Sequence, residues 1–194
     1  MKPPIKSEYP LHQFILDRWS PRSFAGTPLT EETALTLLEA ARFAASANNF
    51  QPWRFIYATK EQTGRFNLLF ECLKEGNKTW VRSASLLLLT LIKVCFDNTD
   101  KPNLWATHDL GLAMGNLTTQ ATSMGLYVHN MAGFDPDKAI AAFHIPAEFR
   151  PVTMVAIGSL GNPDLLPEPL KTRELAAQER KPLSEIILNE KFAL

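Results

Sequence analysis

Residues 30–59 read TEETALTLLEAARFAASANNFQPWRFIYAT and carry the clearest structural pattern in the chain. Thr30 can cap a helix, because its side chain can accept a hydrogen bond from a free backbone N–H of the first turn. The apolar residues that follow recur at helical spacing: Ala34, Leu37, Leu38 and Ala41. The amide-rich residues 45–52 include a closing proline and predict a loop, and the alternating residues 53–58 predict a strand. A helix, a polar loop and a strand are therefore expected in succession.

The rest of the chain continues this alternation of helices and strands. Apolar spacing and capping residues predict helices that end near 17–19, span 61–73 and 104–124, and begin at 135–136. Apolar runs predict strands at 86–96 and 152–157, and Gly76-Asn77 predicts a turn. Such interspersed elements are typical of the α+β and α/β classes.

Two glycines, Gly111 and Gly115, lie inside the helix expected over residues 104–124. Each costs about 1 kcal/mol relative to alanine in a helix interior. We therefore expect another backbone to approach this helix closely. Gly125 follows the pattern and is suited to end the helix as a C-terminal cap.

Charge and hydropathy exclude several classes of protein. The 194 residues include 20 Lys+Arg and 20 Asp+Glu, so the chain has no general electrostatic attraction for nucleic acid or an anionic membrane. The longest apolar run, residues 86–92, is far shorter than the roughly 20 residues that span a bilayer. The first residues, MKPP, lack the apolar segment of a secretory signal. We expect a cytoplasmic protein.

The sequence contains no familiar motif for a catalytic nucleophile, a metal or a nucleotide phosphate. Cys72 and Cys95 form no C-x-x-C pair, so we expect free thiols. The histidines are widely separated, and none is expected to bind a metal: His12, His108, His129 and His144. His108 and Asp109 are neighbours on the expected helix, and we expect their side chains to point in different directions.

A basic turn at residues 18–22 is the first candidate binding feature. Arg18, Ser20 and Arg22 offer two planar guanidinium groups around a small hydroxyl, a combination that suits a phosphate. The alternative is a basic turn exposed to solvent. The turn alone does not decide between the two.

Two further segments offer polar or closely approachable backbone. Residues 46–52 contain Asn48, Asn49 and Gln51, whose amides both donate and accept hydrogen bonds, as the edge of a heterocycle requires. Residues 131–135 form a small-residue turn after an apolar segment, where backbone N–H groups could approach a ligand. The alternatives are an ordinary helix-capping loop and an ordinary turn.

Taken in order, these segments resemble the FMN-dependent nitroreductase family, from about Phe14 to Ile187. The resemblance rests on DRWSPRSF (17–24), AASANNFQPWRF (44–55), HDLGLAMGNLTTQATSMGL (108–126), MAGFD (131–135) and ERKPLSEII (179–187). Two positions depart from the family pattern, since Ala45 stands where a proline is frequent and Trp19 where a second arginine is frequent. Neither departure removes a group that the resemblance assigns to the cofactor.

The resemblance implies a phosphate site for FMN. Arg18, Ser20 and Arg22 would bind the phosphate and nearby ribityl oxygens, Trp19 would contribute its backbone, and Arg180 would reach the same phosphate from the C-terminal tail. Arg180 lies far from Arg18 and Arg22 along a chain of zero net charge.

It also implies a site for the flavin ring. Asn49 would hydrogen-bond the pyrimidine end, and the region of Ser46 would approach the flavin bound mainly by the partner subunit. Met131, Ala132 and Gly133 would lie beside the ring system, with a backbone N–H directed at N5.

The fold implied by the resemblance is an α+β sandwich, a mixed sheet with helices on both faces. Residues 1–162 would form the FMN-binding domain. Residues 163–194 have no core of their own and would be an extension that packs on a homodimer, exchanged with the partner subunit. Composition alone leaves open whether this tail covers its own domain or another subunit.

The activity implied is the reduction of a nitroaromatic, a quinone or a similar small acceptor by NAD(P)H in a ping-pong cycle. A flavin-binding carrier or sensor without turnover is the alternative, and a purely structural dimer is a third. No catalytic side chain and no metal are expected.

Overall fold

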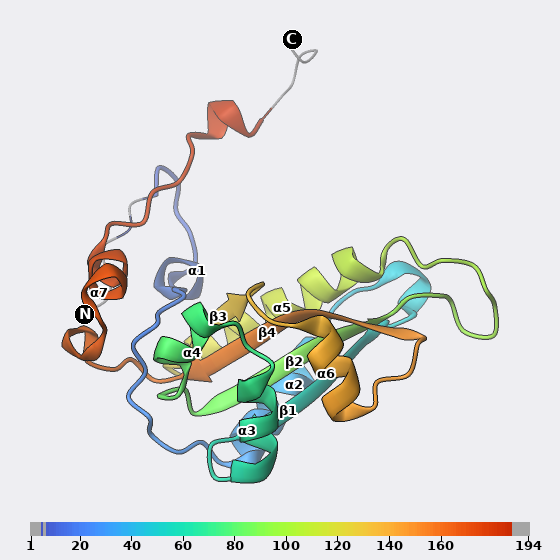
Figure 1. The fold of residues 1–194 in the computed structure, drawn as a ribbon. Helices are drawn as coiled ribbons and strands as arrows, with labels where there is room; N and C mark the ends of the chain where they lie inside the picture. Colours follow the sequence, from blue (N-terminus) through green and yellow to red (C-terminus); the bar gives the residue numbers. More distant parts are fainter. Residues whose placement is uncertain (1–4, 6, 188–194) are drawn as a thin grey trace.

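The computed structural model describes residue 5 and residues 7–187, and its strands form one sheet with helices on both sides (Figure 1). The helices are α1 (Gln13–Asp17), α2 (Glu31–Arg42), α3 (Thr63–Glu71), α4 (Glu75–Val81), α5 (Ala106–Ser123), α6 (Pro136–Phe143) and α7 (Glu168–Leu175). The strands are β1 (Trp53–Thr59), β2 (Leu86–Lys93), β3 (Tyr127–Met131) and β4 (Phe149–Gly158). Short 3₁₀ turns are η1 (Ala47–Asn49), η2 (Pro163–Leu165) and η3 (Leu183–Glu185).

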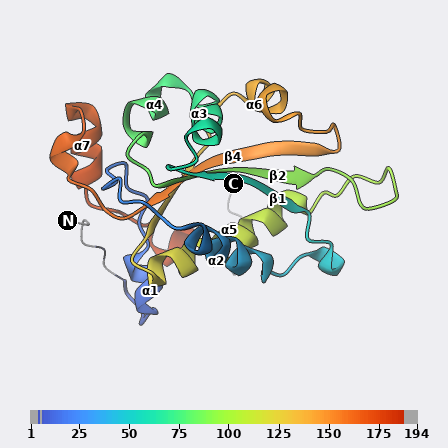
Figure 2. The same ribbon diagram turned by 90° about the horizontal axis from the view of Figure 1, so that it is seen from below.

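The arrangement confirms the α+β class. Figure 2 shows α3, α4 and α6 on one face of the sheet and α2 and α5 on the other. The strand order is β1-β2-β4-β3, and the pairings between the described strands are all antiparallel. The expectation of a mixed sheet is therefore wrong for the described residues.

Strand β2 lies at the centre of the core and is buried along almost its whole length. Leu87, Leu89 and Leu91 pack with α3 and α4, and Leu86 and Leu88 pack with α2 and α5. Alternate side chains of a strand point to opposite faces, so a sheet covered on both sides favours apolar residues at nearly every position. This explains the apolar run in the sequence, in which the buried Thr90 hydroxyl is satisfied by Thr153.

The helix ends confirm the capping residues read from the sequence. The Thr30 side chain accepts a hydrogen bond from the Thr33 N–H, and the Asp135 side chain accepts one from the Lys138 N–H. Gly125 follows α5 with a φ of 71°, a conformation that glycine adopts without strain.

Three local expectations are wrong. Gly76-Asn77 lies in helix α4, because Trp80 and Val81 bury against the sheet and stabilise a helix there. Strand β2 ends at Lys93 rather than at residue 96, since the Val94 carbonyl accepts from the Asn103 N–H and closes a loop. Residues 127–131, read only as an apolar segment, form strand β3.

The C-terminal extension packs partly on its own domain. Leu166 is buried in the core and Leu170 lies against it. Beyond α7 the C-terminal arm, residues 176–187, extends away from the sheet (Figure 1). Residues 188–194 of the extension, and the MKPP segment at the start of the chain, lie outside the described residues. In the part of the chain that the structure describes, no helix has the length and apolar character needed to cross a membrane.

Candidate functional site

Residues 18–23 form an irregular segment in which buried and half-buried side chains alternate. Trp19, Pro21 and Ser23 are buried, whereas Arg18, Ser20 and Arg22 are half-buried. This alternation leaves the three polar side chains on the outer face of the segment. The Trp19 ring lies edge-on against Tyr127 of β3, with the ring centroids 6.4 Å apart. The R-x-S-x-R pattern thus places two cations and a hydroxyl side by side.

The backbone of this segment is held by distant parts of the chain. The Glu174 carboxylate of α7 accepts hydrogen bonds from the Arg22 N–H, at 2.9 and 3.1 Å, and from the Ser23 N–H at 3.0 Å. The Ser23 carbonyl accepts from the Gly161 N–H at 2.9 Å. Glu174 was not identified from the sequence, since a single glutamate in a charged tail carries no local signal.

His129 supports the same segment from strand β3. Its Nδ1 lies 2.8 Å from the Pro21 carbonyl oxygen, and because a carbonyl can only accept, Nδ1 carries the proton. Burial first, and then the positive charge of Arg22, lower the pKa of His129 to about 4. The ring also packs at a tilt against Trp80, with centroids 4.7 Å apart. His129 is therefore neutral near pH 7.

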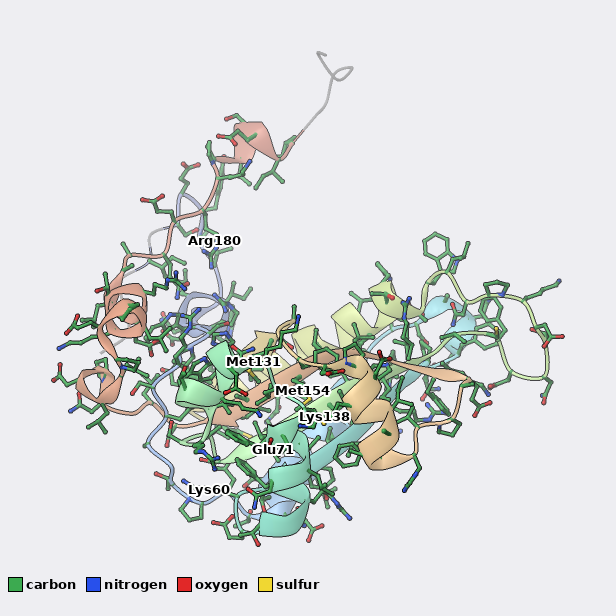
Figure 3. All side chains as sticks on the ribbon, in the orientation of Figure 1. Lys60, Glu71, Met131, Lys138, Met154 and Arg180 are labelled. Atoms are coloured by element: carbon green, nitrogen blue, oxygen red, sulfur yellow. The ribbon has the colours of Figure 1, made fainter. Side chains whose placement is uncertain are left out.

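The C-terminal arm brings a third cation to this face. Arg18 donates to the Ser20 hydroxyl at 3.1 Å and to the Gln178 side-chain oxygen at 3.3 Å. Arg180 donates to the same Gln178 oxygen at 3.4 Å. Burial and then the charge of Arg180 lower the pKa of Arg18. Figure 3 labels Arg180 on the arm.

These cations have no anionic partner among the described residues. Arg18, Arg22 and Arg180 form no ion pair with a carboxylate in the part of the chain that the structure describes. Arg18 contacts the Ser20 hydroxyl and the Gln178 side-chain oxygen, and Arg180, which is exposed, donates to the same Gln178 oxygen. Guanidinium groups that lie beside a hydroxyl and have no carboxylate partner form a site suited to a phosphate.

The loop after α2 is a second, separate feature. Asn48, Asn49 and Gln51 have φ values of 48°, 58° and 49°, in the left-handed region that residues other than glycine seldom adopt. The Ser46 hydroxyl accepts from the Gln51 N–H at 3.0 Å and holds the loop closed. Asn49 is exposed and Ser46 is half-buried. Clustered backbone strain of this kind is frequent at ligand sites.

Asp109 of α5 anchors this loop and was missed as a candidate. Its buried carboxylate accepts a hydrogen bond from the Ala47 N–H at 3.0 Å. His108 Nδ1 lies 3.2 Å from the other carboxylate oxygen, so the expectation that His108 and Asp109 point in different directions is wrong. His108 itself is largely exposed, and no group of residues suited to hold a metal occurs in the described chain.

The turn after β3 is the third feature. Met131 is buried, Ala132 is exposed and Gly133 is half-buried. The Gly133 carbonyl accepts hydrogen bonds from the Lys74 N–H at 3.0 Å and from the Asn77 side-chain amide at 2.9 Å. A Cβ at Gly133 would lie 2.7 Å from the Asn77 amide nitrogen, so this position favours glycine.

One chain brings together only some of the candidate residues. Hydrogen bonds join Arg18 to Ser20, and join Arg18 and Arg180 to Gln178. His129 of β3 contacts the Pro21 carbonyl, and β3 leads to the turn at residues 131–133. The loop that carries Ser46 and Asn49 follows α2, is drawn in cyan and lies at the opposite end of the sheet from α1 and α7 (Figure 1).

Comparison with known proteins gives consistent matches. A model of the Nitroreductase family matches residues 15–90 and 65–159. A solved structure described as an oxidoreductase containing FMN is 38% identical, covers 97% of this chain and 96% of its own, and superposes with a TM-score of 0.91. An uncharacterised 15.4 kDa protein of Mycolicibacterium smegmatis is 37% identical over 62% of this chain and 80% of its own length. A Streptomyces coelicolor protein that carries the name NADH dehydrogenase/NAD(P)H nitroreductase is 28% identical over 73% and 78%.

Proposed function

This chain belongs to the nitroreductase family, and on that premise we propose that it is an FMN-dependent oxidoreductase that takes electrons from NAD(P)H. Its acceptors would be small oxidants such as nitroaromatics or quinones. The observation that carries the proposal is the group formed by Arg18, Ser20, Arg22 and Arg180, which has the donors for a phosphate and forms no ion pair with a carboxylate among residues 7–187. The FMN named for the solved relative at 38% identity supports the same cofactor here.

The donor set fits the phosphate monoester of FMN. Arg18 and Arg22 would bind its oxygens as planar donors, Ser20 would add a hydroxyl, and the backbone of Trp19 would lie beneath them. Arg180 would close the site from the C-terminal arm. Such charge-assisted hydrogen bonds contribute about 1.5–3 kcal/mol each.

The ring of the flavin would extend from the phosphate towards the turn at residues 131–133. Met131 would support it from the core, and Ala132 and Gly133 would present backbone without a bulky side chain, with an N–H directed at N5. The loop that carries Ser46 and Asn49 would reach the pyrimidine end of a flavin bound mainly by the partner subunit, because this loop lies at the opposite end of the sheet from α1 and α7 (Figure 1).

Bound FMN would supply the redox chemistry, and the protein would position it and the substrates. NAD(P)H and the acceptor would occupy the same face in turn, which is a ping-pong cycle. No protein nucleophile is required in such a cycle. The chain itself would bind the phosphate, orient the ring and shape the entrance.

Anaerobic reduction tests this proposal directly. The purified protein should be yellow, and denaturation should release FMN. Addition of NADH or NADPH under anaerobic conditions should bleach the flavin absorption within seconds, and a nitroaromatic or a quinone should restore it. A protein that neither contains FMN nor binds added FMN would contradict the proposal, and a yellow protein that neither nucleotide bleaches would favour the carrier or sensor function.

We also propose a homodimer, in which α5 provides the contact. The face of the molecule around α1, α2 and α5 exposes large apolar side chains, with Phe43 72% and Trp105 59% exposed. An open groove of about 340 Å³ lies among these helices and is lined by residues such as Phe14 and Phe43. Added Cβ atoms at Gly111 and Gly115 meet nothing within 4 Å among the described residues, so the expected backbone neighbour would come from a second copy.

Replacement of Gly115 by alanine should have opposite effects on the isolated chain and on the dimer, and therefore tests the α5 contact. In an isolated helix alanine is about 1 kcal/mol more favourable than glycine. In a dimer with a closely approaching backbone the added methyl group would instead clash. We expect Gly115→Ala to weaken the dimer by at least about tenfold, equivalent to about 1.4 kcal/mol, as measured by sedimentation equilibrium.

Gly76→Ala is the matched control, because Gly76 lies in α4 and an added Cβ there also meets nothing within 4 Å. This variant should leave the dimer unchanged. Wild-type protein should have a mass near twice 21.7 kDa by light scattering. An unchanged dissociation constant for Gly115→Ala, or a monomeric protein with bound FMN, would contradict the α5 contact.

A further inference from the structure

The buried carboxylate of Glu174 connects helix α7 to the segment that carries Arg18, Ser20 and Arg22. We propose that Glu174 is a positioning residue for phosphate recognition, and that it makes docking of the C-terminal arm and binding of the cofactor phosphate one coupled event. The inference rests on the proposed FMN site. It concerns a residue that does not touch the phosphate and acts through the backbone of Arg22 and Ser23.

Glu174 is an unusual glutamate, because it is only 2% exposed and no lysine or arginine pairs with it among the described residues. A buried charge is costly unless hydrogen bonds satisfy it. Both carboxylate oxygens accept from the Arg22 N–H, and one also accepts from the Ser23 N–H. Two backbone amides thus take the place of a cation as the partners of this carboxylate.

These hydrogen bonds fix the direction in which the side chains of the segment point. Glu174 holds the N–H groups of Arg22 and Ser23 from the buried side, while His129 holds the Pro21 carbonyl. With its backbone bound at three consecutive residues, the segment cannot rotate. Ser20 and Arg22 must then remain on the outer face.

The same residue fixes the start of the C-terminal arm. Glu174 lies in the last turn of α7, and the chain continues from it to Gln178, whose side-chain oxygen accepts from both Arg18 and Arg180. Helix α7 and the arm that follows it are therefore attached to the Arg18–Ser23 segment at two points, through Glu174 and through Gln178. A loss of the Glu174 contact would displace Arg22 and Arg180 together, although they lie far apart in the sequence.

The test compares FMN with riboflavin, which has the same ring and lacks the phosphate. The full-length apoprotein and its Glu174→Gln variant are titrated with each ligand by isothermal titration calorimetry. Glutamine loses the charge and one of the acceptor oxygens. We expect the FMN dissociation constant to rise by at least about tenfold, the lower range for loss of a charged hydrogen bond, and that of riboflavin to change by less than about twofold.

Glu168→Gln is the matched control, since Glu168 lies in the same helix and is exposed. It should bind both ligands as the wild type does. Should Glu174→Gln fail to fold, as judged by circular dichroism, Glu174→Asp is titrated in its place, because it keeps the charge and shortens its reach. The same selective loss of FMN affinity is expected.

The outcomes separate this inference from the proposed function. A selective loss of FMN affinity supports a positioning role. Equal losses for FMN and riboflavin would show a general effect on stability and overturn it, as would unchanged affinities. If the wild-type protein binds FMN but the Glu174 variants show no selective loss of FMN affinity, the positioning role is wrong and the proposed function is unaffected. If the wild-type protein binds no FMN, the proposed function itself is wrong.

Discussion

The Gly161→Ala variant is expected to lose about 3 kcal/mol of unfolding free energy, the upper part of the usual range for overpacking. A Cβ at Gly161 would lie 2.4 Å from the Phe24 carbonyl oxygen, 2.5 Å from its carbon and 2.9 Å from the Ser23 hydroxyl. Two of these are backbone atoms of a bridge between Phe24 and Leu160, so no side-chain rotation relieves the clash. The two chain segments joined by this bridge would have to separate, and the hydrogen bond from the Gly161 N–H to the Ser23 carbonyl would weaken.

Urea unfolding at 25 °C measures this loss. Gly64→Ala is the control, because Gly64 lies in α3 and an added Cβ there meets nothing within 4 Å. Helix propensity makes that change neutral or stabilising by up to about 1 kcal/mol. A Gly161→Ala variant as stable as Gly64→Ala would show that the Phe24–Leu160 bridge is looser than the structure indicates.

Local patterns in the sequence predicted most of the elements. Helix α2 and strand β1 follow from capping, apolar spacing and a polar loop within one continuous stretch. The prediction of a turn at Gly76-Asn77 is wrong because α4 is stabilised by burial of Trp80 and by the hydrogen bond from the Asn77 side-chain amide to the Gly133 carbonyl. Both contacts join residues far apart in the sequence. Tertiary packing of this kind overrides weak local propensity.

The candidate site divides in the same way. Arg18, Ser20 and Arg22 were predicted because two guanidinium groups flank a small hydroxyl within one short segment of the sequence. Glu174 and Asp109, which hold the backbone of the two binding segments, were not found. Each is a single carboxylate that accepts a hydrogen bond from a backbone N–H far away in the chain. Only the folded structure can identify such a residue.

The zero net charge of the chain conceals an uneven distribution of charged side chains in the structure. Several carboxylates of the described residues pair with lysines or arginines, such as Glu39 with Arg42 and Asp164 with Lys171. Glu174 of α7 contacts the Arg18–Ser23 segment, but both of its oxygens accept hydrogen bonds from backbone N–H groups. The arginine side chains on the outer face thus keep their charge available for an external anion.

Removal of the Arg22 side chain tests that availability. We expect Arg22→Ala to weaken FMN binding by about 1.5–3 kcal/mol, or about 10- to 150-fold, the scale of a charged hydrogen bond. Riboflavin affinity should be nearly unchanged, because Arg22 would act on the phosphate. The Glu174 carboxylate bonds to the backbone N–H of Arg22, which alanine retains, so the fold of the segment should persist.

A second measurement shows independently that the Arg22 side chain lies where the structure places it. The charge of Arg22 lowers the pKa of His129, so Arg22→Ala should raise this pKa from about 4, as followed by NMR titration of the imidazole. Arg65→Ala removes an exposed arginine of α3 and should change neither quantity. A raised His129 pKa with unchanged FMN affinity would remove Arg22 from the phosphate site while leaving its position in the fold intact.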